Sequence, residues 1–128
     1  MRLLLDTHVA LWAIADDRRL KAPGRGLILD PSNTVVVSAV SVWEIAIKHS
    51  LGRGDMPISA ADALGYFKAS GYVMLEVSAE HAALVEQLPP IHADPFDRLI
   101  VAQALREPLR LMTHDAMVAR YSESFIEV

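Results

Sequence analysis

Four acidic residues fall where predicted strands end or where the following helices begin: Asp6, Glu44, Asp97 and Asp115. Several ionised oxygens held together suit a hard divalent cation, and Mg²⁺ or Mn²⁺ bound by carboxylates can orient a phosphodiester, polarise it and lower the pKa of a bound water. Clustered carboxylates without an ion would repel one another, and their pKa values would rise. The four acids therefore predict a metal site, provided that the fold brings them together.

Helix capping is an alternative role for each acid taken alone. Ser41 and Glu44 have the S-x-x-E spacing of a capping box, in which the Glu side chain reaches back to the amide of the cap residue. Asp94 can be the N-cap of a helix that starts at Pro95, with Asp97 as an acid stabilised by the helix dipole. The other two acids can cap helices in the same way. Capping explains each acid separately, but it does not explain why acids recur at these positions.

Further polar side chains adjoin the candidate acids. The hydroxyls of Thr7, Ser38 and Thr113 can fix a carboxylate or a metal-bound water, or they can form simple caps and turns at strand ends. Arg98 can contact a phosphate with two nitrogens, or it can pair with a neighbouring acid such as Asp94. Both roles stay open for each of these residues.

The elements that must position these side chains are strands and helices, whose sequence patterns alternate along the chain. Short apolar or β-branched runs predict strands at residues 3–5, 35–37, 73–77 and 109–113, and a final edge strand at 125–127. Helical spacing with Pro and Gly punctuation predicts helices at 8–14, 23–29, 42–48, 60–69, 79–88, 95–106 and 115–119. This order predicts an α/β fold with a mostly parallel sheet, in which ligands collect at the carboxyl ends of the strands.

Composition limits the class of protein. The 128 residues are 52% hydrophobic and predict a single domain, residues 1–128. With no cysteine there are no disulfides and no Cys-based metal sites, and the net charge of -4 argues against a protein that coats nucleic acid through charge alone. No apolar run approaches the ~20 residues that span a bilayer, and Asp6 interrupts the first apolar run too early for a signal peptide. We therefore expect a soluble, cytoplasmic protein with no membrane association.

Four motifs resemble, in order and spacing, those of one protein family. They are residues 3–8 (LLLDTH), 38–48 (SAVSVWEIAIK), 94–104 (DPFDRLIVAQA) and 113–115 (THD). They look like the successive motifs of PIN-domain proteins, specifically the VapC-like toxins of toxin-antitoxin pairs. The resemblance spans nearly the whole chain, and no acidic position of the family pattern is missing.

The resemblance implies a PIN-like α/β/α sandwich and a ribonuclease that depends on Mg²⁺ or Mn²⁺. By this resemblance, Asp6 and Asp97 are the expected direct metal ligands, while Glu44 and Asp115 complete the pocket directly or through water. Asp94 also lies in the motif; we assign it first to the helix cap and leave a supporting role open.

The resemblance also implies partners. It predicts an RNA substrate, a homodimer, and a cognate VapB-like antitoxin whose C-terminal segment lies between the early helices. The early helices carry more apolar residues than one hydrophobic core need bury, so some could contact the antitoxin, although core packing is the alternative role. These residues are Val9, Leu11, Trp12, Ile14, Trp43 and Ile47. Basic residues that could contact phosphates are sparse, and we single out Lys48 and Arg98 from a set that also includes His49, Arg53, Arg106, Arg110 and Arg120.

Two rival functions can be compared with this hypothesis. A phospho-receiver domain shares the sheet type and an acidic Mg²⁺ pocket, but it needs a Lys after a late strand, and the lysines here are Lys21, Lys48 and Lys68. We set that reading aside. A catalytically silent PIN module that only binds protein or RNA remains the alternative, because capping explains each acid by itself.

Overall fold

The computed structural model describes residues 1–52 and 56–128, so the candidate phosphate contact Arg53 lies outside the described residues. The strands in these ranges are β1 (Arg2–Leu5), β2 (Thr34–Ser38), β3 (Val73–Leu75), β4 (Arg110–Thr113) and β5 (Ile126–Glu127). The helices are α1 (Thr7–Ala15), α2 (Ala22–Leu29), α3 (Ala39–Ser50), α4 (Ala60–Ala69), α5 (Ala79–Leu84), the 3-10 helix η1 (Val85–Gln87), α6 (Pro95–Arg106) and α7 (Ala116–Ala119). Within the same ranges, no helix has the length and apolar character that a membrane span requires.

The strands form one parallel sheet in the order β3-β2-β1-β4-β5. The first strand of the chain therefore lies at the centre, with Leu3 paired to Val35 on one side and to Arg110 on the other. The predicted edge strand near the C-terminus is also present, where Ile126 pairs with Met112. The prediction of a mostly parallel sheet is confirmed.

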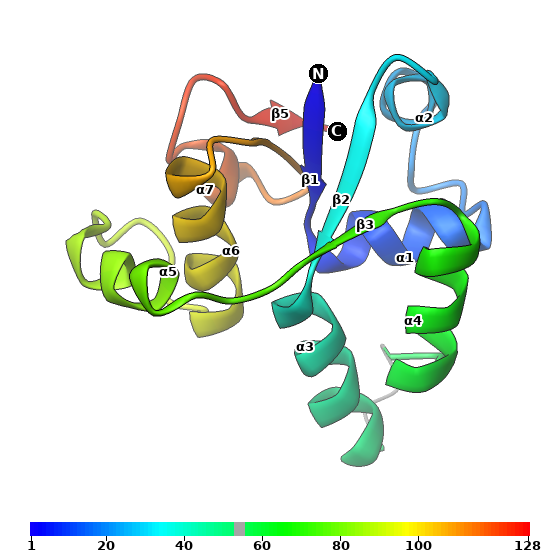
Figure 1. The fold of residues 1–128 in the computed structure, drawn as a ribbon, viewed down its shortest axis with the longest axis horizontal. Coiled ribbons are helices and arrows are strands. Elements are labelled where there is room, and N and C mark those ends of the chain that lie inside the picture. The colour runs from blue at the N-terminus through cyan, green and yellow to red at the C-terminus, as the bar shows by residue number, and fades with distance from the viewer. Residues whose placement is uncertain (53–55) are drawn as a thin grey trace.

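Helices cover both faces of this sheet (Figure 1). Leu3 and Leu5 of β1 pack into an apolar cluster with residues of α1, α2 and α4, whereas Leu4 packs into a second cluster with α6. Successive side chains of a strand point to opposite faces, so a central strand covered on both sides must be apolar throughout. This explains the continuous run of leucines, and the predicted α/β/α sandwich is confirmed.

Helix α3 begins three residues earlier than the predicted helix. The hydroxyl of Ser38 accepts a hydrogen bond from the backbone N–H of Val40 and is the N-cap. Ser41 therefore lies inside the helix, and the capping box proposed for Ser41 and Glu44 is wrong. Glu44 lies beyond the first turn, where its side chain is free of capping and points into the protein.

Two further boundaries differ from the prediction. The predicted strand 73–77 ends at Leu75, because its partner β2 ends at Ser38, opposite Leu75, where α3 begins. The predicted helix 79–88 is α5 followed by η1, which stops before Pro89 and Pro90. Proline cannot continue a helical hydrogen-bond ladder and restricts the residue before it.

Candidate active site

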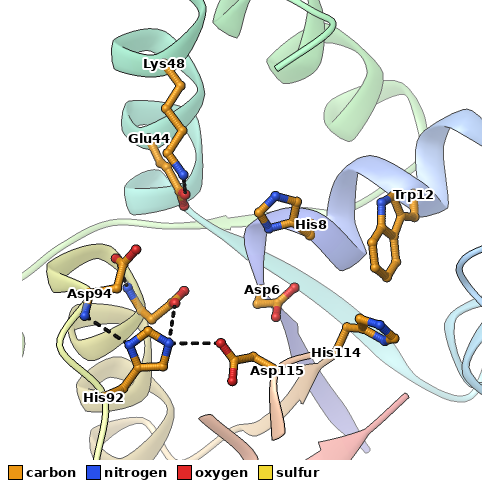
Figure 2. A pocket seen from close by; sticks show the side chains of 10 residues that line it. Asp6, His8, Trp12, Glu44, Lys48, His92, Asp94, His114 and Asp115 are labelled. Atoms are coloured by element: carbon orange, nitrogen blue, oxygen red, sulfur yellow. Dashed lines mark hydrogen bonds and ion pairs between the residues drawn. The ribbon is translucent and has the colours of Figure 1, made fainter. Parts of the chain in front are cut away.

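The carboxyl ends of the central strands open into a cavity of about 440 Å³ (Figure 2). The residues that line it are Asp6, His8, Trp12, Glu44, Lys48, His92, Asp94, Asp97, His114 and Asp115. All four acids singled out from the sequence therefore face one pocket, together with Asp94 and Lys48. Parallel strands explain this convergence, since their carboxyl ends meet at the same edge of the sheet.

Asp6 both caps a helix and lines the pocket. Its Oδ1 accepts a hydrogen bond from the backbone N–H of Val9 at 2.8 Å, and its Oδ2 accepts one from the Thr113 hydroxyl at 2.6 Å. The residue is only 7% exposed, and this burial raises the pKa of its carboxyl group. The capping role and the site role are therefore compatible in one side chain.

Glu44 is held from both sides. Its Oε1 accepts a hydrogen bond from the Thr7 hydroxyl at 2.6 Å, and the Lys48 ammonium lies 2.5 Å from its Oε2. The same Thr7 hydroxyl lies 2.9 Å from the hydroxyl of Ser41. Because Glu44 is 3% exposed, these contacts fix a buried carboxylate at the pocket wall.

Asp97 is the acid whose negative charge is least compensated by hydrogen bonds and ion pairs from the protein. Asp94 caps α6 through hydrogen bonds from the N–H groups of Phe96 and Asp97, which places the Asp97 side chain in the first turn. Burial, and after it the neighbouring carboxylates of Asp94, Asp6 and Glu44, raises the pKa of Asp97 to about 7. Within residues 1–52 and 56–128, its carboxylate accepts no hydrogen bond, and the ring of His92 approaches it at 3.4 Å.

Asp115 is the most exposed of the four acids. Its Oδ1 accepts a hydrogen bond from the backbone N–H of Met117 and caps α7, and its Oδ2 lies 2.9 Å from Nε2 of His92. Partial burial would raise the pKa of this carboxyl group, but the hydrogen bonds from His92 and from the N-terminus of α7 outweigh it, and the pKa is lowered.

His92 is a pocket residue that the sequence reasoning did not single out. Its Nε2 faces Asp115 (Figure 2) and also Asp97. One potential ligand atom of each of these three side chains lies within 4.8 Å of the others. Its Nδ1 lies 3.0 Å from the backbone N–H of Asp94. The spacing His-x-Asp before a helix-starting proline was the available signal, since it lets a histidine ring reach the amide of the cap residue.

The predicted supporting residues divide into two groups. Thr7 and Thr113 hold carboxylates of the pocket directly. Ser38 instead caps α3 and donates a hydrogen bond to the side-chain oxygen of Gln103. Arg98 does not pair with Asp94: its guanidinium donates to the backbone carbonyls of residues 85, 89 and 92, and it thereby holds the segment before α6.

The donors in this pocket suit a hard cation. Each oxygen of Asp6 and Glu44 receives one hydrogen bond or ion pair from the protein, and a carboxylate oxygen can accept a second partner. Among the described residues, Asp97 has only the ring of His92 near its carboxylate, at 3.4 Å. Carboxylate oxygens are the ligands that Mg²⁺ and Mn²⁺ prefer, so the residues present fit a divalent ion.

Comparison with known proteins identifies the family. Residues 3–124 match the PIN domain. The chain belongs to the PIN-domain family. A curated relative of this PIN domain is Ribonuclease VapC22 of Mycobacterium tuberculosis, which is 32% identical over 116 residues that cover 88% of this chain and 86% of the relative. The resemblance to VapC-like proteins is therefore confirmed.

Solved structures share the fold of this PIN domain. VapBC2 from Rickettsia felis, bound to a DNA fragment from its promoter, has a matching chain with a TM-score of 0.68 and 19% identity, covering 100% of this chain and 98% of that one. A chain of VapBC-1 from nontypeable Haemophilus influenzae matches with a TM-score of 0.56 and 17% identity, covering 100% and 97%. At these identities the likeness concerns the fold.

Proposed function

We propose that this PIN domain is a VapC-like endoribonuclease toxin that hydrolyses RNA phosphodiester bonds with Mg²⁺ or Mn²⁺. It acts as a single domain over residues 1–128. Asp6 and Asp97 bind the ion directly, and Glu44 and Asp115 bind it directly or through water. Membership of the PIN-domain family and the relationship to a VapC ribonuclease support this reaction class.

The observation that carries the proposal is the unbalanced charge of Asp97. Its partly buried carboxylate faces a pocket that three other candidate acids line, and the nearest donor among residues 1–52 and 56–128, Nε2 of His92, lies 3.4 Å away. Carboxylates grouped in this way repel one another, and a bound cation would relieve that repulsion, which supports a metal at this position. When bound, a divalent ion orients and polarises the phosphodiester and lowers the pKa of an attacking water.

The chain itself supplies orientation for this chemistry. Thr113 and Thr7 hold Asp6 and Glu44 from buried positions, so these carboxylates do not need to reorganise when an ion and substrate arrive. Lys48 lies at the pocket and is the proposed contact for an RNA phosphate. Arg98 remains a proposed phosphate contact, and its hydrogen bonds to backbone carbonyls support a second role in holding the 85–92 segment.

We further propose a cytoplasmic toxin that forms a homodimer and is neutralised by a cognate VapB-like antitoxin. Support for the antitoxin comes from the VapBC complexes that share this fold. An apolar cavity of about 320 Å³ beside α1 offers a place for its segment, lined by Leu11, Ile14, Ala15, Pro57, Ile58 and Tyr66. Sizing of the protein alone and after co-expression with the product of the neighbouring small gene tests both assemblies.

A cleavage assay on total RNA with added Mn²⁺ tests the catalytic proposal. We expect the wild type to cut RNA, EDTA to stop it, and Asp97→Asn to abolish cleavage, because the amide cannot supply the charged oxygen that the ion needs. Thermal unfolding of the variant checks that its fold is retained. Equal cleavage by Asp97→Asn in the presence of EDTA would contradict the proposal, and RNA binding without cleavage by the wild type would favour a silent module.

A further inference from the structure

His92 has a single hydrogen-bonding state that fits its surroundings. The backbone N–H of Asp94 lies 3.0 Å from Nδ1, and an N–H group can donate only to a ring nitrogen that carries no proton. The proton of the neutral ring is therefore on Nε2. This N–H points at Oδ2 of Asp115, 2.9 Å away (Figure 2). Oδ2 of Asp97 lies 3.4 Å from the same nitrogen.

The backbone of His92 is also held in place. Its N–H donates to the hydroxyl of Tyr121 at 2.8 Å, and its carbonyl accepts from the guanidinium of Arg98 at 3.3 Å. Tyr121 follows α7 and Arg98 belongs to α6, so the histidine is fixed to the two helices whose first residues carry the acids that it faces. Such support is typical of groups that orient a ligand.

We propose that His92 is a positioning residue that holds Asp115 beside Asp97 by donating its Nε2–H, and that it is not a metal ligand. The distances among His92, Asp97 and Asp115 would by themselves permit a three-ligand site. A nitrogen that carries a proton has no lone pair for a metal, however, and moving this proton to Nδ1 would break the bond from Asp94. This inference rests on the proposed ribonuclease activity of the same site.

Two substitutions separate the two hydrogen bonds of the ring. In His92→Asn, the amide oxygen is near the position of Nδ1 and can still accept from Asp94, but the side chain is too short to donate to Asp115. In His92→Gln, the amide nitrogen is near the position of Nε2 and can donate to Asp115, but the bond from Asp94 is lost. We expect His92→Asn to lower kcat and Mn²⁺ affinity about 10- to 100-fold with little change in KM for RNA, and His92→Gln to retain most of both.

The opposite order would overturn the proposal. If His92→Gln is the more impaired variant, or if His92→Asn behaves as wild type, the histidine only stabilises the loop before α6. Isothermal titration with Mn²⁺ gives the affinities without any cleavage, so they remain decisive even if the wild type fails to cut RNA and the proposed function falls.

Nitrogen-15 NMR of the wild-type imidazoles provides a test that needs no variant. We expect the His92 ring to carry its proton on Nε2 both before and after Mg²⁺ is added. A proton on Nδ1 in place of Nε2 in the free protein would contradict the argued hydrogen bonds, and loss of the Nε2 proton when Mg²⁺ binds would indicate a metal ligand; either result contradicts the proposal.

Discussion

The two walls of the acidic pocket are built differently. Asp6 and Glu44, from the start of α1 and from α3, are almost fully buried, and each of their oxygens has a protein partner. Asp97 and Asp115, from the starts of α6 and α7, have side chains that are 23% and 39% exposed, and they meet at His92. Acidic side chains are thus held by buried protein donors on one side of the pocket and are more open to solvent on the other.

The largest effect that tests this comparison is on stability. Thr113→Val and Thr7→Val each remove a hydroxyl donor from a buried carboxylate, so each should lower the free energy of unfolding by roughly 1–3 kcal/mol. His92→Asn should lower it less, because water can reach the exposed oxygen of Asp115. Urea unfolding of the three variants measures these differences, and a His92 variant as unstable as the threonine variants would mean that the walls are alike.

A smaller effect concerns pH and Asp97. The carboxyl group has a pKa of about 7 in the folded protein against 3.8 when unperturbed, so the folded chain binds more protons between these values. The free energy of unfolding of the metal-free protein should therefore fall as pH rises through this window. The difference between the two pKa values corresponds to about 4 kcal/mol, and solvent screening of a side chain that is 23% exposed should reduce it to about 2 kcal/mol.

Asp97→Asn provides the control for the pH effect. It removes the titrating group, so the variant should become more stable than the wild type as pH approaches 8, and the two should converge near pH 4. Thermal unfolding across this range measures the difference. If stability depends on pH in the same way in the two proteins, the ionisation of Asp97 does not destabilise the fold.

The smallest effect belongs to Lys48, the cation on the buried wall. If its ammonium contacts an RNA phosphate, Lys48→Ala should weaken RNA binding several-fold and reduce the salt dependence of log Kd by about one unit. Binding by a cleavage-defective Asp97→Asn background at several salt concentrations measures this slope. An unchanged slope would restrict Lys48 to neutralising Glu44.

Local patterns were sufficient for much of the fold. The continuous leucines of β1 and the Asp94-Pro95 start of α6 depend on burial and capping, which neighbouring residues report, and both were predicted correctly. The predicted start of α3 was wrong because two serines, Ser38 and Ser41, could each serve as the N-cap. Only the end of β2 in the sheet decides between them.

The sequence by itself determined that acids occur at the ends of the strands and that the sheet is mostly parallel, because residue periodicity and turn residues act over short distances. The tertiary structure decided how these acids are used. Thr113 bonds to Asp6 across 107 residues of chain, and His92 reaches Asp115 across 23. Such contacts depend on which helix N-termini lie side by side in the folded protein. The spacing of residues along the chain does not determine which N-termini these are.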